Sequence, residues 1–283
     1  MHDHQQNFQS LLFQEFTGMP RATLCPRCRQ LIGSEETVCS WCGTARSAPW
    51  WKIMSWAKGT IASDGVIRAI ITLNIIYYAI SILIAPPVGL LSPSQYSMMI
   101  LGATGTIPID SYGNYWSLLT ANYLHGGILH LIFNLMALRQ IAPLAINEYG
   151  AARAVTIYTV GGVFGFLVSY LAGVPFTIGA SAAVCSLVGS LLYYGKSRGG
   201  AYGSAIYSEL SGWVVSIFIF GLVFPGINNW GHGGGLVGGM LLGMILGYSE
   251  KRRETVISRV LALLCISATL FSLVLALART LGG

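Results

Sequence analysis

The stretch NNWGHGGGLVGGMLLGMILG, residues 228–247, carries no acidic or basic side chain except His232 and has a glycine at every fourth position from Gly231 to Gly247. Small residues on one face of a helix let a neighbouring helix approach closely, which is typical of packed membrane helices. An ionisable group at membrane depth is costly and is by default a functional candidate. The stretch therefore predicts a tightly packed membrane helix that carries a functional histidine. The glycines alone indicate packing and no particular activity.

The composition agrees with a membrane location. Of 283 residues, 54% are hydrophobic and only 9% are charged, against about 25% charged in average soluble proteins. The net charge of +6 comes from short basic clusters between apolar segments, the usual pattern of topology determinants, so we expect no nucleic-acid partner. The polar start predicts no cleavable signal peptide and a cytoplasmic N-terminus.

Seven apolar segments lie beyond residue 65, each near the length of about 20 residues that a spanning helix needs. They are 66–86, 120–143, 151–172, 179–196, 206–225, 230–248 and 256–278. Basic residues gather before the first segment and in the even-numbered connections, so the positive-inside rule predicts a cytoplasmic N-terminus and an external C-terminus. The expected fold class is an all-α polytopic membrane protein in contact with lipid.

Ser181 and His232 begin the fourth and sixth segments, which both run inward, so both residues are expected near the outer face. A serine hydroxyl is a weak nucleophile that needs an adjacent base, most often histidine. We expect the two helices to pack face to face, with Ser181, Cys185 and Gly189 on one side of the fourth. No acidic residue is near His232 in the sequence, which predicts a Ser–His dyad. Cys185, one turn deeper, is interpreted as a packing residue.

The second segment contains His130 and Asn134, four residues apart and therefore on one helical face, with His125 just before them. Together with the backbone N–H of Ser181, these two side chains are candidate donors to an oxyanion. A plain interhelical hydrogen-bonded pair is the alternative. Zinc-protease chemistry is not supported, because no H-E-x-x-H motif occurs. Polar residues, Asn228 among them, are expected to hold water at the site.

The N-terminal part contains two C-x-x-C pairs after a polar tail, residues 1–24. Cys25, Cys28, Cys39 and Cys42 predict a structural zinc ribbon, residues 25–43, with disulfides or redox motifs as alternatives. Such a module is expected to bind a cytoplasmic partner, to sense metal or redox state, or to anchor the chain. Residues 44–65 interleave Trp and Lys, which indicates a linker at the lipid headgroups, or a linker without lipid contact.

Three motifs in order resemble the rhomboid intramembrane serine proteases: TANYLHGG (120–127) leading to HLIFN (130–134), then GAS (179–181), then WGHGGG (230–235). The resemblance covers residues 66–250 and implies a six-helix core, to which residues 251–283 add a cytoplasmic connector and a seventh helix. It implies Ser181 as nucleophile and His232 as general base, without a catalytic cofactor. It also implies oxyanion stabilisation by His130 and Asn134, support from His125 and Gly179, and transmembrane-helix substrates that enter past the fifth segment.

Three positions depart from the family pattern: Ala182 replaces the last glycine of G-x-S-G, Ser117 replaces the arginine of a Trp-Arg pair, and Cys185 replaces an aromatic residue. An inactive rhomboid-like adaptor that binds transmembrane clients is the main alternative function. Such adaptors lack the serine or the histidine, whereas this chain has both. A transporter is disfavoured because the sequence shows no internal repeat.

Overall fold

The computed structural model describes residues 22–24, 31–33, 36, 38–43, 63–88, 91–224, 226–252 and 254–282. The chain divides into two compact units, residues 1–59 and 60–283. Of the expected tail, 1–24, only the last three residues are described. Residues 44–62 of the expected linker lie outside the described residues, and its last three already belong to the first long helix.

The N-terminal unit contains a short antiparallel strand pair, β1 (Ala22–Leu24) and β2 (Leu31–Gly33). The segment between the strands holds Cys25 and Cys28, which lie outside the described residues. After the second cysteine pair, the backbone N–H of Gly43 donates to the carbonyl of Cys39 at 2.9 Å. Gly43 has φ +69°, in the left-handed region that favours glycine. The chain therefore makes a tight turn after Cys42.

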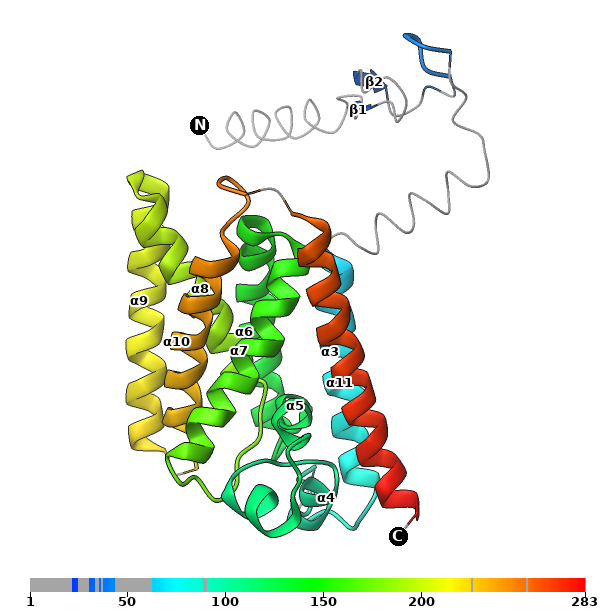
Figure 1. Ribbon diagram of the computed structural model, residues 1–283, viewed down its shortest axis with the longest axis vertical. Helices are drawn as coiled ribbons and strands as arrows, with labels where there is room; N and C mark the ends of the chain where they lie inside the picture. Colours follow the sequence, from blue (N-terminus) through cyan, green and yellow to red (C-terminus); the bar gives the residue numbers. More distant parts are fainter. Residues whose placement is uncertain are drawn as a thin grey trace, which may run out of the picture. The chain divides into compact units, whose positions relative to one another are not determined.

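The second unit is helical (Figure 1). Its elements are α3 (Ser63–Leu83), α4 (Gln95–Ile100), the π-helical turn η1 (Ile107–Ser111), α5 (Ser117–Thr120), the 3₁₀ turn η2 (Ala121–Tyr123), α6 (Ile128–Tyr149), α7 (Ala151–Leu171), α8 (Ser181–Arg198), α9 (Gly200–Val223), α10 (Asn229–Leu246) and α11 (Val256–Gly282). The seven expected segments thus correspond to the seven longest described helices.

Five of the described helices are long and apolar enough to cross a membrane: α3, α6, α7, α9 and α11. This supports an integral membrane protein. The helices α8 and α10 were both expected to span but are not among the five, because Lys196 and Arg198 in α8, and Asn229, His232 and the glycines in α10, lower their mean hydropathy. Both lie inside the bundle, where α8 is buried along almost its whole length and contacts α6, α7, α9 and α10.

The largest difference from the expected segments is at 120–143. Residues 117–123 form the short turns α5 and η2, and the long helix begins only at Ile128. The pair Gly126-Gly127 interrupts the helix, since glycine is a poor helix former. The helix then continues through Pro143 to Tyr149. His125 therefore lies in the connection between η2 and α6 rather than on the helix.

The glycines of α10 bring it against two neighbours. A Cβ atom on Gly235 or Gly239 would overlap the backbone carbonyl of Ala182 or Ser186 in α8. Gly234 and Gly238 instead face α7, and Gly247 ends the helix with φ +70°. The glycines of α10 thus allow close packing on two faces of the helix, one against α8 and one against α7.

The face of α8 in this contact differs from the expected one. Gly189 lies against the backbone of Leu236, as expected, but the other contacts are made by Ala182 and Ser186, one residue after Ser181 and Cys185. Ser181 still contacts α10 through His232, so the expected face differs at Cys185, whose place in the close contacts is taken by Ser186. The close contacts are made by backbone carbonyls of α8, whose direction the spacing of small side chains does not reveal.

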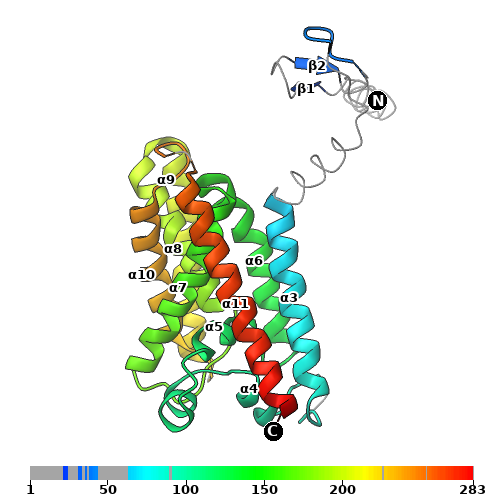
Figure 2. The ribbon, with the colours of Figure 1, turned by 45° about the vertical axis from the view of Figure 1, so that its right-hand side comes forward.

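The region between α3 and α6 lies at the end of the bundle where the C-terminus is found (Figure 1). Thr104 exchanges two backbone hydrogen bonds with Thr177, at 3.1 and 2.7 Å. Thr177 belongs to the segment that leads into α8. Near its C-terminal end, α11 approaches α4 and α5 (Figure 2). The loop region is thus held by both α11 and the segment before Ser181.

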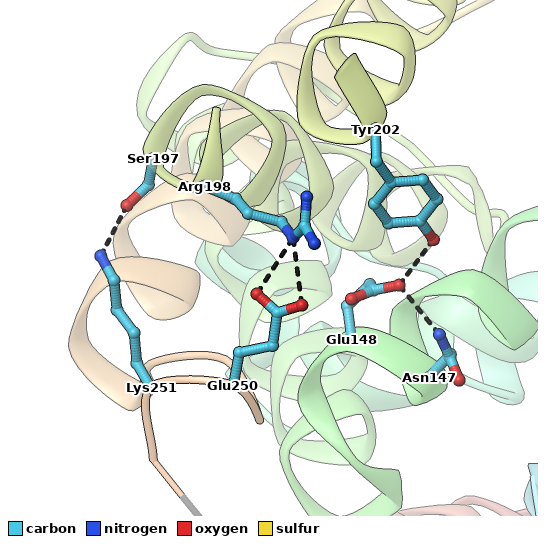
Figure 3. Close-up of polar contacts among 7 residues, drawn as sticks. All are labelled: Asn147, Glu148, Ser197, Arg198, Tyr202, Glu250 and Lys251. Carbon is cyan, nitrogen blue, oxygen red and sulfur yellow. Dashed lines mark hydrogen bonds and ion pairs between the residues drawn. The ribbon is translucent and has the colours of Figure 1, made fainter. Parts of the chain in front are cut away.

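Polar contacts connect several helices at the opposite end (Figure 3). Arg198, at the end of α8, forms an ion pair with Glu250, both N–O distances being 3.0 Å. The buried carboxylate of Glu148 accepts hydrogen bonds from Tyr202 and Asn147, both at 2.9 Å. The start of α9 is therefore attached to the end of α6.

Candidate active site

Ser181 and His232 are in contact. The Nε2 atom of His232 lies 2.9 Å from the Oγ atom of Ser181, a hydrogen-bonding distance. Ser181 is the first residue of α8 and His232 lies in the first turn of α10. The packing of α8 on α10 described above brings the two helix starts to the same depth.

The segment before Ser181 has one conformation that requires glycine. Gly179 has φ +122°, and its N–H donates to the carbonyl of Ala121 at 2.9 Å. A Cβ atom on Gly179 would lie 2.8 Å from Nε2 of His130. Gly179 thus leaves room for the imidazole of His130 to approach the start of α8, which agrees with its expected supporting role.

The imidazole of His130 presents a hydrogen-bond donor, Nε2–H, next to Gly179. Its Nδ1 atom accepts a hydrogen bond from the backbone N–H of Gly126 at 3.3 Å, so in the neutral ring Nε2 carries the proton. That N–H group lies next to Gly179, two residues before Ser181. The backbone N–H of Ser181 is a second donor, because the first N–H groups of a helix have no intrahelical partner.

His125 is fully buried in the connection before α6 and packs edge-on against His130, with ring centroids 5.1 Å apart. Burial lowers the pKa of His125 to about 3, and the nearby His130 adds to this shift. His125 is therefore neutral at physiological pH and supports His130 by packing.

Asn134 is used differently from the expectation. Its side-chain amide donates to the carbonyl of His130 at 2.8 Å, within α6, and the residue is buried. One of its two amide protons is therefore engaged in its own helix. Asn134 shares a helical face with His130, as the spacing predicted.

The second ring nitrogen of His232, Nδ1, is buried and has no hydrogen-bond partner among the described residues. No acidic side chain contacts the ring in this part of the chain. Among the described residues, no carboxylate completes a triad with Ser181 and His232. The orientation of the imidazole ring must therefore depend on contacts other than a hydrogen bond to Nδ1.

Asn228 is a residue whose structural role the sequence did not reveal. It was expected to hold water, but it caps α10 and also bonds to Ser169 and Thr177. Asparagine is among the preferred N-cap residues, so its place before an apolar glycine-rich helix was a usable indication. The two long-range partners leave no trace in the sequence.

The departures from the family pattern are accommodated by their surroundings. The methyl group of Ala182 lies opposite Gly165 in α7, where a Cβ atom would be only 3.0 Å away. Cys185 is buried inside α8, as expected for packing.

The side chain of Ser117 is also buried and donates to the hydroxyl of Thr104 at 2.9 Å. A cation still reaches the neighbouring Trp116. The guanidinium of Arg279, in α11, lies 5.6 Å from the indole and donates to Asn114 at 3.1 Å. Trp116 donates to the same Asn114 oxygen at 3.2 Å. The seventh helix therefore supplies a positive charge next to the position where the family pattern has its arginine.

Residues 112–249 match the Rhomboid domain family. Rhomboid protease GluP of Bacillus subtilis (strain 168) is 34% identical over 135 residues, 48% of this chain and 27% of the relative. RHOMBOID-like protein 4 of Arabidopsis thaliana is 31% identical over 159 residues, 56% of this chain and 40% of the relative. Rhomboid-like protease 5 of Toxoplasma gondii is 30% identical over 162 residues, 54% of this chain and 19% of the relative. The chain thus spans less than half the length of these three relatives. The matches support the rhomboid family for the segment that carries Ser181 and His232.

Proposed function

We propose that this chain is an intramembrane serine endopeptidase of the rhomboid type, in which Ser181 is the nucleophile and His232 the general base. The observation that carries the proposal is the 2.9 Å contact between Oγ and Nε2 inside a bundle of apolar helices. The name of the GluP relative, a rhomboid protease, supports the same activity. No cofactor is needed for this chemistry.

The reaction uses the two side chains in sequence. The Ser181 hydroxyl gives its proton to Nε2 of His232 as Oγ bonds to the scissile carbonyl carbon. The C–N bond then breaks while His232 returns the proton to the leaving nitrogen. Water next attacks the acyl carbon, His232 takes its proton, and the proton goes back to Oγ as the acid product leaves. Because no carboxylate among the described residues bonds to Nδ1 of His232, we propose a Ser–His dyad rather than a triad.

The oxyanion formed in this reaction needs preorganised donors. The Ser181 backbone N–H and the Nε2–H of His130 are proposed as the two main donors, supported by the hydrogen bond that fixes the His130 tautomer. Asn134 is proposed as a third donor through its remaining amide proton. His125 and Gly179 act by holding His130 in place.

The substrate is proposed to be a transmembrane helix that enters past α9. Support comes from the uneven burial of α9, whose buried residues, Gly203, Ile206 and Leu210, all lie in its first half. The first half is attached to α6 through Tyr202 (Figure 3), whereas no residue of the second half is buried.

Phe218, in the second half of α9, packs next to Gly233 beside His232. Phe218→Ala and Trp213→Ala should speed cleavage of a membrane substrate and leave labelling of Ser181 by a small fluorophosphonate within about twofold. Val215→Ala, an exposed position on the same helix, is the matched control. Unchanged cleavage in Phe218→Ala and Trp213→Ala would rule out the α9 entry route.

The site is proposed to face the outer side of the membrane, with the N-terminus in the cytoplasm. Lys196 and Arg198 lie in the last turn of α8, which begins at Ser181, and Lys251 and Arg252 follow the end of α10, which agrees with the positive-inside rule. Modification of cysteines introduced at Gly113 and Gly199 by a membrane-impermeant reagent on whole cells tests this. Only the first should react.

The cysteine module is proposed to bind one structural zinc ion through Cys25, Cys28, Cys39 and Cys42. The described half fits, because the turn at Gly43 follows the second pair and a strand pair flanks the first. Thiolates at such a site hold the ion and stabilise the fold. Zinc content should be about one ion per chain and should fall in Cys39→Ser, while Cys265→Ser, in α11, should keep it. A cytoplasmic partner for this module stays a proposal.

The deciding experiment compares purified protein with Ser181→Ala and with Ser190→Ala, another serine of α8, whose hydroxyl is buried and bonds within its own helix. Fluorophosphonate labelling and cleavage of a model transmembrane substrate should both disappear in Ser181→Ala and persist in Ser190→Ala. Wild type and Ser181→Ala behaving alike would contradict the protease and favour the non-catalytic adaptor.

A further inference from the structure

The side chain of Asn228 uses its full set of amide donors at the start of α10. Its Oδ1 atom accepts from the backbone N–H of Gly231 at 3.0 Å, which caps the helix. Its Nδ2 group donates to the hydroxyl of Ser169 at 2.7 Å and to the hydroxyl of Thr177 at 2.9 Å. Both hydroxyl partners are buried, where an unmade hydrogen bond is costly.

The two hydroxyls belong to two other elements. Ser169 lies near the end of α7, and its own proton goes to the carbonyl of Gly165 at 3.0 Å. Thr177 lies in the segment that leads to Ser181, and its backbone is fixed by the two hydrogen bonds with Thr104. Asn228 therefore joins the start of α10 to α7 and to the segment that positions Ser181.

His232 lies one turn after Asn228 and donates its backbone N–H to the Asn228 carbonyl at 3.1 Å. In a Ser–His–Asp triad, an acid bonded to the second ring nitrogen holds the imidazole in place. In the described part of this chain the Nδ1 atom of His232 has no such partner. The position of the ring is then set by the backbone of the first turn of α10.

We propose that Asn228 is the positioning residue of the site: through the first turn of α10 it holds His232 at bonding distance from Ser181, in place of the third member of a triad. This inference rests on the proposed function. It predicts a specific kinetic effect. Loss of the two Nδ2 hydrogen bonds should slow acylation of Ser181 and lower kcat, because small errors in geometry are costly. The KM for a membrane substrate should change little, since the Asn228 side chain bonds to Ser169 of α7 and to Thr177 rather than to α9, the proposed entry route.

The test uses the full-length protein in detergent. Asn228→Ser keeps an oxygen that can cap α10 but is too short to reach both hydroxyls. Asn74→Ser is the matched control, since Asn74 is a buried asparagine of α3 whose amide bonds within its own helix. The measured quantities are the rate of fluorophosphonate labelling of Ser181, kcat and KM for a model substrate, and Tm.

We expect Asn228→Ser to lower the labelling rate and kcat about 10- to 100-fold and to keep KM within about twofold. Asn74→Ser should lower Tm at least as much but label at a normal rate below its Tm. The double variant Ser169→Ala/Thr177→Val removes the acceptors and leaves Asn228 in place. It should reproduce the kinetic loss, and it decides the question if Asn228→Ser fails to fold.

Normal labelling of Asn228→Ser, or a loss that Asn74→Ser shares at equal Tm, would overturn the positioning role alone. Absence of labelling in the wild-type protein is a different result, because it would overturn the proposed function and this inference with it. A rise in KM with unchanged kcat would also contradict the inference, since it would indicate a role in substrate binding.

Discussion

Gly165 in α7 offers a direct test of how tightly the Ser–His contact depends on packing. A Cβ atom at this position would lie 2.6 Å from the carbonyl oxygen of Gly231 and 3.0 Å from the Cβ of Ala182. These two residues directly neighbour His232 and Ser181 in the sequence. Gly165→Ala would therefore insert a methyl group between the starts of α8 and α10.

The size of the effect follows from these distances. Ordinary contact begins at 3.4 Å, so the difference from 2.6 Å, about 0.8 Å, must come from movement of the first turn of α10. Movement of that size away from Ser181 would lengthen the 2.9 Å contact to about 3.7 Å, beyond a hydrogen bond. Misplacement by about 1 Å can cost about 100-fold in rate. Overpacking should also cost about 1–3 kcal/mol of stability.

The assay is the rate of fluorophosphonate labelling at Ser181, measured with Tm in the same detergent. Gly165→Ala should label about 10- to 100-fold more slowly than wild type. Gly212→Ala is the matched control, because a Cβ atom at Gly212 meets no atom within 4 Å. It should label normally. Labelling of Gly165→Ala within about twofold of wild type would refute the reasoning, since a dyad held by packing cannot tolerate this wedge.

Three further results are expected. Arg279→Gln removes the cation from Trp116 and should lower stability by about 0.5–1 kcal/mol, seen as a lower Tm that Arg279→Lys partly restores. Tyr149→Phe removes the hydrogen bond to the Ser190 carbonyl and should lower the free energy of unfolding by about 0.5–1.5 kcal/mol, measured by denaturant titration. If the cysteine module binds zinc as proposed, chelation should release the metal and leave Ser181 labelling within about twofold, because the cysteines and Ser181 belong to different compact units; a larger loss would indicate coupling.

Much of the helical fold could be predicted from apolar segment length. The segment 151–172 corresponds to α7, Ala151–Leu171, because an apolar run bounded by Gly150 leaves little choice. Prediction was wrong at 120–143, where apolar residues continue through α5 and η2 although the backbone turns at Gly126-Gly127. Hydropathy cannot distinguish a short buried turn from the first turn of a long helix.

The contact between Ser181 and His232 was also predictable, because a serine and a histidine near the same end of two apolar segments stand out in the sequence. What surrounds them was not. The contacts of Asn228 with Ser169 and Thr177 span 59 and 51 residues, and Arg279 lies 165 residues from Asn114. Such pairs depend on how helices dock, which no local pattern records.

The glycines of residues 228–247 lie at increasing distances from His232 along α10, and Gly235, three residues after His232, packs next to Ser181. At 1.5 Å per residue, Gly235 lies about 4.5 Å along the axis from His232, and Gly243 about 16 Å. The backbone partner of Gly235 is Ala182, next to Ser181, whereas Gly243 packs against Ser190 in the middle of α8. The contact that brings α8 and α10 together is therefore continuous with the contact between Oγ and Nε2. Because no acid holds the imidazole in the described part of the chain, the packing that stabilises the bundle also sets the geometry of the site.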